Sequence, residues 1–318
     1  MKIGFIGLGN VGSKLAGSLL RNGFDLTVRD LDRASAEPLL NQGARWAQSP
    51  GEMAAQVDMV ITCLPNPAAS AAVMESEDGV LAALAPGVIW AEMSTTDEQE
   101  VRRLGAAVVQ RGGEPIDCPV SGGCHRATTG NISIFAGSQR TTFERALPVL
   151  AAMGREILHT GPLGSASVLK VVTNYLASVN LVALGEALMT AKRAGMNLNT
   201  AFEAIRISSG NSFVHETESQ VILNGSRNIN FTMDLVLKDL GLFQGIAERA
   251  NVPLEISPLL LRIFEDGKTR YGAREWSPNI VRRLEEACAE QLLAPGFPAE
   301  ILDLVPEQPG REVVPGQG

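Results

Sequence analysis

Basic residues are scarce in this chain, and no run of them occurs anywhere along its 318 residues. Lysine and arginine total 27 against 35 aspartate and glutamate residues, so the formal net charge at pH 7 is −8. Proteins that bind nucleic acid neutralise its phosphates with a basic surface, which this composition does not supply. We therefore expect no nucleic-acid partner.

Cysteine is also sparse, with four residues in all: Cys63, Cys118, Cys124 and Cys288. Their spacing matches no zinc-binding pattern, and a chain of this length does not need disulfide bonds to stabilise its core. We therefore expect reduced thiols, a cytoplasmic location and no metal centre.

Long uninterrupted hydrophobic runs are missing as well. The nearest candidate for a membrane span, between Lys170 and Glu186, is short and contains several polar residues. The N-terminal segment MKIGFIG has a single lysine and leads directly into a glycine motif, so it is predicted to be a strand rather than a signal peptide. We expect no membrane partner.

The order of predicted elements divides the chain into two parts. Predicted strands at 2–6, 26–30, 58–64, 88–93, 114–118, 132–137 and 156–161 alternate with helical segments, which indicates a parallel sheet of βαβ units. From 165 to about 194 the chain is predicted to be one long apolar helix, followed by helices at 198–208, 213–223, 232–250, 256–267 and 278–290. The long helix at about 165–194 is apolar on most faces and should therefore be buried between domains or subunits. No strand is predicted after residue 161.

These patterns predict an α/β domain at 1–162 and an all-helical domain at 163–292, joined by the long helix. The last segment, 293–318, is rich in proline and glycine and is predicted to be a tail.

A glycine motif lies between the first predicted strand and the first predicted helix. It reads GLGNVG and comprises Gly7, Leu8, Gly9, Asn10, Val11 and Gly12. In a G-x-G-x-x-G turn the first glycine permits the tight turn, the second lets a pyrophosphate approach the backbone, and the third lets the helix pack closely on the strand. Its position between strand and helix favours a dinucleotide site over a purely structural turn.

Asp30 ends the second predicted strand, where the acid that binds the ribose of a dinucleotide is expected. A carboxylate accepts hydrogen bonds from both ribose hydroxyls and repels the additional phosphate of NADP. The sequence therefore predicts NAD as the cofactor, with NADP as the alternative because Arg29 and Arg33 flank Asp30.

The segment DCPVSGG (117–123) follows a predicted strand and ends in Ser121, Gly122 and Gly123. Two adjacent glycines expose backbone N–H groups and the serine adds a hydroxyl, an arrangement that suits a carboxylate. A plain turn is an equally good interpretation of the composition.

Lys170 lies on the long apolar helix, and Asn174 follows four residues later on the same helical face. A buried lysine has a lowered pKa and can act as acid or base near neutral pH. The alternative is a lysine that extends its amine out of the helix. Lys238 and its neighbour Asp239 form a second candidate pair, which composition alone would assign to an exposed helix surface.

Together, GFIGLGNVG (4–12), DCPVSGG (117–123), GSASVLKVVTN (164–174) and KDLGL (238–242) resemble the four ordered signatures of the β-hydroxyacid dehydrogenase family. That family includes 3-hydroxyisobutyrate and tartronate semialdehyde dehydrogenases. The resemblance covers roughly residues 1–290 and implies a Rossmann-like domain followed by a helical domain for substrate binding and oligomerisation, with the active site in the cleft.

The resemblance also implies roles. Lys170 would be the catalytic acid/base, and Ser121, Gly122 and Gly123 would bind the substrate carboxylate. Asn174 would help to hold the substrate, Lys238 would lie near substrate and nicotinamide, and Asp239 would support it. Leu64, Pro65 and Thr95 would line the cofactor. The family further implies a homodimer or homotetramer.

One departure from the family pattern follows the loop, where the chain reads Cys124-His125-Arg126. Arg126 is a candidate for binding a second anionic group on the substrate. His125 is interpreted as a solvated loop residue, with a role in specificity as the alternative.

The sequence as a whole predicts an oxidoreductase that transfers hydride between NAD and the hydroxyl carbon of a small β-hydroxy acid or its semialdehyde. Two alternatives stay open: a reductase that acts mainly on aldehyde acids, and a dinucleotide-binding scaffold without catalysis.

Overall fold

A computed structural model describes residues 1–316; the last two residues of the predicted tail, 317 and 318, lie outside the described range. The contacts divide the chain into two compact units. Unit 1 comprises Met1–Lys170 together with the C-terminal segment from Asp303 onward, and unit 2 comprises Val171–Leu302.

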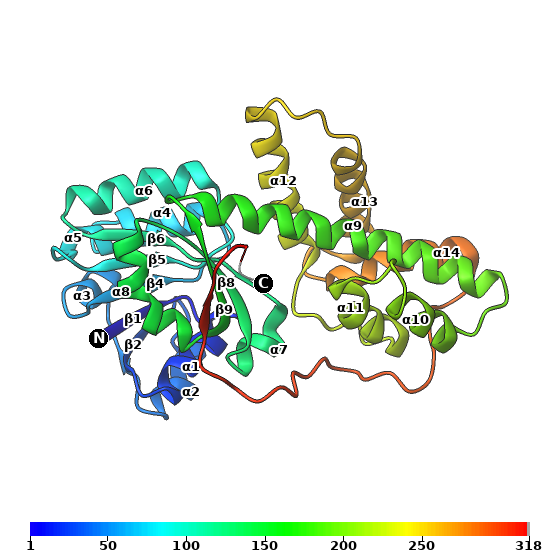
Figure 1. Cartoon of the computed structure of the whole chain (residues 1–318), viewed down its shortest axis with the longest axis horizontal. Coiled ribbons are helices and arrows are strands. Elements are labelled where there is room, and N and C mark those ends of the chain that lie inside the picture. Colours follow the sequence, from blue (N-terminus) through cyan, green and yellow to red (C-terminus); the bar gives the residue numbers. More distant parts are fainter. Residues whose placement is uncertain (317–318) are drawn as a thin grey trace. The chain divides into compact units, whose positions relative to one another are not determined.

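Unit 1 is built on a sheet whose strands come from the N-terminal half and from the end of the chain (Figure 1). The strands are β1 (Lys2–Ile6), β2 (Asp25–Arg29), β3 (Arg45–Trp46), β4 (Met59–Thr62), β5 (Ile89–Glu92), β6 (Glu114–Asp117), β7 (Val120–Ser121), β8 (Ile132–Gly137), β9 (Gly154–Gly161) and β10 (Arg311–Val313). Their order across the sheet is β10-β9-β8-β6-β5-β4-β1-β2-β3, and β7 pairs with β8.

The first six strands run parallel, in the spatial order 3-2-1-4-5-6 of a Rossmann fold. The direction of winding reverses between β1 and β4, and parallel strands bring all their carboxyl ends to one edge. Ligands of such folds bind at this edge, at the reversal point. β8 is antiparallel to β6, and β9 and β10 run parallel to β8.

Successive residues of a strand point to opposite sides of the sheet, and helices cover both sides, so each strand contributes apolar residues to two buried faces. Ile3 and Phe5 of β1 belong to one hydrophobic cluster, whereas Ile6 belongs to another. Helices α1 and α8 contribute to the first cluster and α3 and α6 to the second. The helices of unit 1 are α1 (Gly12–Arg21), η1 (Arg33–Ala36), α2 (Glu37–Leu40), α3 (Pro50–Ala54), α4 (Pro67–Glu75), α5 (Val80–Ala83), α6 (Glu98–Gln110), α7 (Gly123–Thr128) and α8 (Arg140–Ala151).

Helix α9 (Ser165–Arg193) begins in unit 1 and continues into unit 2, which is helical. A single core there joins the later part of α9 to the remaining helices. These are α10 (Leu198–Arg206), α11 (Phe213–Asn224), α12 (Met233–Arg249), α13 (Ile256–Tyr271), η2 (Ser277–Val281) and α14 (Arg282–Cys288). The predicted fold class, a Rossmann-like α/β domain followed by helices and including a helix at about 165–194, is confirmed.

Two predictions from the sequence are wrong: that no strand follows residue 161, and that no segment is long and apolar enough to span a membrane. A strand does follow residue 161, because β10 pairs with the exposed edge of β9 near the end of the chain. One helix, α9, is also long and apolar enough to cross a membrane by length and composition, since its apolar residues continue beyond Glu186. A single helix of this kind is weak grounds for a membrane span, because the core helix of a water-soluble protein passes the same test.

Candidate active site

The glycine loop follows β1 at the carboxyl edge of the sheet, and two of its glycines are required by close packing. Gly7 has a φ of +98°, and a Cβ there would collide with the Cys63 carbonyl oxygen. A Cβ on Gly12 would collide with the Gly7 carbonyl oxygen. The chain can therefore turn from β1 into α1 only with glycine at both positions.

Gly9 differs from its two partners. A Cβ placed on it would meet nothing within 4 Å, so the backbone at Gly9 faces open space. This opening lies beside the N-terminus of α1, whose first N–H groups and dipole favour an anion. Asn10 is exposed and Val11 half-buried in the same turn. The loop therefore fits a dinucleotide pyrophosphate.

Asp30 follows β2 next to this loop. Its Oδ2 accepts a hydrogen bond of 2.6 Å from the backbone N–H of Leu8, and its Oδ1 accepts one of 3.0 Å from that of Asp32. The carboxylate thus ties the glycine loop to the end of β2, where the ribose-binding acid of a Rossmann fold lies. The flanking Arg29 and Arg33 place their guanidinium carbons 5.7 and 5.4 Å from the centre of the Trp46 ring.

Two further loops reach the same edge from β4 and β5, on the β4 side of β1. The backbone N–H of Leu64 donates a 2.7 Å hydrogen bond to the Ser94 hydroxyl, which connects the two loops. Pro65 is exposed and Thr95 half-buried beside them. Gly7, Asp30, Leu64 and Thr95 all follow strands that end at this edge, so these predicted cofactor residues lie on one side of unit 1. Lys238, also predicted to lie near the nicotinamide, belongs to unit 2.

Glu92, the last residue of β5, is 1% exposed and lies beneath these loops. Its Oε1 accepts a 2.9 Å hydrogen bond from the Ser94 backbone N–H. Burial raises the pKa of Glu92 above its ordinary value, although hydrogen bonds from Ser94 act in the opposite direction. The buried acid therefore supports the pair of loops through Ser94.

Glu92→Gln is expected to change how stability depends on pH. A raised carboxyl pKa in the folded chain means that stability is lost as pH rises from about 4.5 towards the raised value. Glutamine keeps the acceptor oxygen but does not titrate, so the free energy of unfolding of the variant should rise relative to that of wild type as pH increases. The rise is about 1.4 kcal/mol for each tenfold difference between the acid's dissociation constants in the folded and unfolded chains. Urea unfolding at several pH values measures this gain; a gain that stays constant with pH would contradict the assignment.

The start of α9 is tied to the loop after β6 by a buried aspartate. Asp117 accepts hydrogen bonds from the backbone N–H groups of Gly164 and Ser167, each 2.7 Å, and from the Ser167 hydroxyl at 2.9 Å. A carboxylate at a helix N-terminus satisfies backbone donors and complements the dipole. Burial raises the pKa of Asp117, and these hydrogen bonds oppose the rise. Lys170 lies three residues beyond Ser167 and is 8% exposed.

The predicted carboxylate loop lies in the segment that connects β6 to α7, directly after Asp117. Ser121 pairs with Ser133 of β8, and Gly122 and Gly123 have φ values of +127° and +84°. Helix α7 then begins at Gly123, so His125 lies on a short helix and is half-buried, rather than on a solvated loop as predicted. Burial and the Arg126 charge lower the pKa of His125.

In unit 2 the three predicted polar residues meet between α9 and α12. Asp239 is 3% exposed and accepts a 2.6 Å hydrogen bond from the Asn174 side-chain amide. Its other carboxylate oxygen lies 3.0 Å from the Lys238 amine. Tyr175, which follows Asn174 in α9, stacks on Phe243, which lies one helical turn beyond Asp239 in α12; the ring centres are 4.1 Å apart. The aspartate therefore orients both the amide and the amine, so the pair at 238–239 is not an ordinary exposed one.

Sequence reasoning missed three supporting residues: Glu92, Ser94 and Asp117. Glu92 is a lone acid in the apolar strand segment VIWAEM, and Asp117 is the first residue of the segment DCPVSGG, so both signals were present. A fourth residue, Trp46, was missed because its strand, β3, has only two residues. Among residues 1–316, no group of three or more histidine, cysteine or acidic side chains could hold a metal ion.

Comparison with known proteins gives two family models that together span most of the chain. Residues 2–161 match the NAD binding domain of 6-phosphogluconate dehydrogenase, and residues 164–284 match the NAD-binding domain of NADP-dependent 3-hydroxyisobutyrate dehydrogenase.

Full-length relatives agree with these models. The 2-(hydroxymethyl)glutarate dehydrogenase of Eubacterium barkeri is 33% identical over 90% of this chain and 95% of that protein. The NAD-dependent L-serine dehydrogenase of Pseudomonas aeruginosa is 33% identical over 89% and 97%, respectively. A crystal structure of 3-hydroxyisobutyrate dehydrogenase from Salmonella typhimurium superposes with a TM-score of 0.81 at 28% identity, covering 89% of this chain and 99% of that one.

The sheet order, the glycine loop and these similarities define an oxidoreductase with an NAD-binding Rossmann domain. More narrowly, the chain belongs to the β-hydroxyacid dehydrogenase family.

Proposed function

We propose that this protein oxidises the hydroxyl group of a small β-hydroxy acid with NAD, and that Lys170 is the general acid/base. The observation that carries the proposal is the buried Lys170 on the first turns of α9, a helix anchored through Asp117 to the loop that ends in Ser121–Gly123. A lysine amine largely withdrawn from water would be able to exchange a proton with the hydroxyl of a substrate whose carboxylate is bound by this loop.

The relatives point to a common substrate shape. The substrates in their names, 2-(hydroxymethyl)glutarate, L-serine and 3-hydroxyisobutyrate, each have a hydroxymethyl group on the carbon that bears a carboxylate. They differ only in the third substituent of that carbon. A site for this shape needs a fixed carboxylate anchor, a proton acceptor at the hydroxyl and a variable pocket wall.

Each requirement has a candidate in the chain. The N–H groups and hydroxyl of Ser121, Gly122 and Gly123 would bind the carboxylate. The Lys170 amine would accept the hydroxyl proton in oxidation and return it in reduction. Asn174 and Lys238, both held by Asp239, would orient the substrate.

The fit to NAD rests on the open face at Gly9 and on the Asp30 carboxylate. When bound, NAD supplies the acceptor for the hydride that leaves the hydroxyl-bearing carbon. The loop Gly7–Gly12 would hold the pyrophosphate and Asp30 the ribose, while Leu64, Pro65 and Thr95 would line the nicotinamide side.

Asp30→Ser should change the preference between cofactors. Loss of the carboxylate removes an acceptor for the ribose hydroxyls and the repulsion of the NADP phosphate, and leaves Arg29 and Arg33 in place. We expect kcat/KM for NAD to fall about tenfold or more and the ratio of NAD to NADP to shift by about a hundredfold, equivalent to about 2.7 kcal/mol. Initial rates with each cofactor measure the ratio; an unchanged ratio would show that another residue selects the cofactor.

The function is tested by initial-rate reduction of NAD and of NADP with a panel of acids. The panel contains 3-hydroxyisobutyrate, 3-hydroxypropionate, L-serine, glycerate, threonate, 4-hydroxybutyrate and 2-(hydroxymethyl)glutarate. Turnover of a hydroxymethyl acid but not of 4-hydroxybutyrate is the expected result. Binding of NAD without turnover of any acid, or of any aldehyde acid in the reverse direction, would instead favour a non-catalytic scaffold.

The protein's setting is part of the same proposal. We infer a cytoplasmic enzyme that acts as a homodimer or homotetramer, as the family resemblance implies. Size-exclusion chromatography with light scattering tests the assembly; a monomer at micromolar concentration would overturn it.

A further inference from the structure

The C-terminal segment 303–313, called here the C-terminal strap, belongs to unit 1 and lies outside both family models, the second of which ends at residue 284. Its last residues form β10, which adds a parallel strand to β9 with Glu312 opposite Ile157 (Figure 1). A segment predicted to be a tail therefore completes one edge of the Rossmann sheet.

The strap is held at its β10 end by close and specific contacts. The backbone N–H of Gly310 donates a 3.0 Å hydrogen bond to the Ala151 carbonyl, and a Cβ at this glycine would collide with the Gly154 carbonyl oxygen. Glu312 forms a bidentate ion pair with Arg140, with distances of 2.5 and 2.9 Å.

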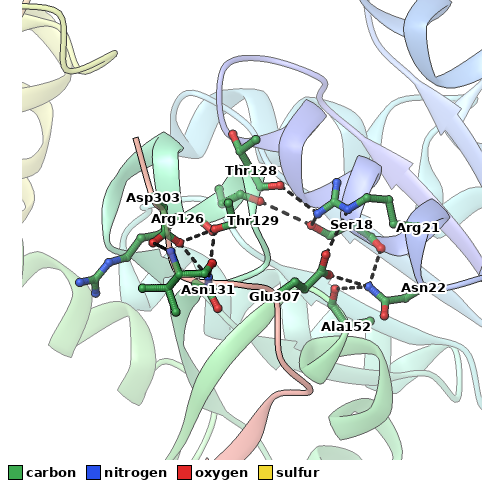
Figure 2. Close-up of polar contacts among 12 residues, drawn as sticks. Ser18, Arg21, Asn22, Arg126, Thr128, Thr129, Asn131, Ala152, Asp303 and Glu307 are labelled. Carbon is green, nitrogen blue, oxygen red and sulfur yellow. Dashed lines mark hydrogen bonds and ion pairs between the residues drawn. The ribbon is translucent and has the colours of Figure 1, made fainter. Parts of the chain in front are cut away.

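The middle of the strap contacts the end of α1. Glu307 accepts a 2.9 Å hydrogen bond from the Asn22 amide and pairs with Arg21 at 3.2 Å (Figure 2). This contact and those of β10 fix the course of the strap, so the position of its first residue, Asp303, is also restrained.

The beginning of the strap is bonded to the turn that closes α7. The Asp303 carboxylate accepts hydrogen bonds from the Thr129 hydroxyl and, at 2.8 Å, from the Asn131 amide (Figure 2). The Asn131 amide also donates a 2.8 Å hydrogen bond to the Val305 carbonyl. In turn, the backbone N–H of Asn131 donates a 2.9 Å hydrogen bond to the Arg126 carbonyl of α7.

Helix α7 is packed directly on the proposed carboxylate loop. A Cβ on Gly122 would lie 3.2 Å from Cδ of Arg126, and a Cβ on Gly123 would lie 2.9 Å from Cε1 of His125. Side chains of α7 thus approach both glycines, although Gly123 itself is exposed. A displacement of α7 would move the backbone N–H groups that the proposed function assigns to the substrate carboxylate.

From these contacts we propose that Asp303 is a positioning residue for the substrate, which acts through Thr129, Asn131 and α7 on the loop Ser121–Gly123. This inference rests on the proposed function of that loop. The strap would set the affinity for the acid and leave the glycine loop, and hence the affinity for NAD, unchanged.

The test compares Asp303→Ala with the control Glu312→Ala, which removes a strap carboxylate that pairs with Arg140 of α8 instead of with the turn after α7. Asp303→Ala is expected to raise KM for the acid about tenfold, with kcat and KM for NAD within about twofold. Asp303→Asn keeps an acceptor oxygen for Thr129 and Asn131 and should restore most of the affinity. The control should lower thermal stability without changing KM for the acid.

Hydrogen exchange provides a readout that does not need turnover. Amides of residues 121–131 should exchange faster in Asp303→Ala than in wild type or in the control. If no acid is turned over by wild type, the proposed function fails, yet the exchange still decides whether the strap holds this loop. Unchanged exchange, or an equal rise of KM in Asp303→Ala and Glu312→Ala, would overturn the inference.

Discussion

Lys170→Ala is expected to lower kcat by about a thousandfold, with the affinity for NAD kept within about twofold. General acid–base catalysis by one side chain contributes about 10²–10⁴-fold, and a proton acceptor at the substrate hydroxyl is needed in every turnover. The residues proposed to hold the pyrophosphate and ribose of NAD lie on the loops after β1 and β2 and do not include Lys170. Stopped-flow reduction of NAD measures kcat, and calorimetric titration measures the affinity for NAD.

Two further variants separate the role of the proton from that of the charge. Lys170→Arg keeps a positive charge but cannot lose its proton under working conditions, so it should be nearly as slow as the alanine variant. Lys192→Ala removes a lysine from the last turn of the same helix and should retain wild-type turnover. Turnover close to wild type in either Lys170 variant would show that another group moves the proton.

The fold was predictable where patterns are local. Strands of four or more apolar residues separated by glycine or proline, and helices with apolar residues on one face, were placed close to their observed positions. The Gly7–Gly12 motif needed only its position between strand and helix to be interpreted. β10 could not be predicted in this way, because three residues in a proline- and glycine-rich segment form a strand only when the edge of β9, about 150 residues earlier in the chain, is present to pair with them.

The candidate site was predictable as a set of residues but not as a set of contacts. The motifs identified Lys238 and Asp239. The hydrogen bond from Asn174 to Asp239, however, depends on how α12 packs against α9. The stacking of Tyr175 on Phe243 belongs to the same packing of the two helices. The supporting acids were missed for a related reason. An acid in an apolar strand is interpretable only when its donors are known, and those of Asp117 lie about 50 residues away.

Removal of the Asp117 carboxylate is expected to be the most damaging change outside the proposed catalytic residues. Asp117→Ala leaves the backbone N–H groups of Gly164 and Ser167 buried without their acceptor, and each such group costs about 1–3 kcal/mol. We expect unit 1 to lose about 3 kcal/mol of stability. Asp117→Asn keeps the shape but turns a donor towards one of these N–H groups, so it should lose about half as much.

Because the two units need not unfold together, the measurement must report on unit 1 alone. Trp276→Phe removes the tryptophan of unit 2 and leaves Trp46 and Trp90, so tryptophan fluorescence during urea unfolding then follows unit 1. Asp117→Ala and Asp117→Asn are compared with the parent in this background.

The same carboxylate should matter for turnover even when the protein is folded. It fixes the first turn of α9, and Lys170 lies on the next turn, so loss of the anchor displaces the amine from the substrate hydroxyl. A misplacement of about 1 Å can cost about a hundredfold in rate, and we expect kcat of folded Asp117→Ala to fall at least about tenfold. A destabilised variant with wild-type kcat would restrict Asp117 to folding, whereas full stability would contradict its role as the anchor of α9.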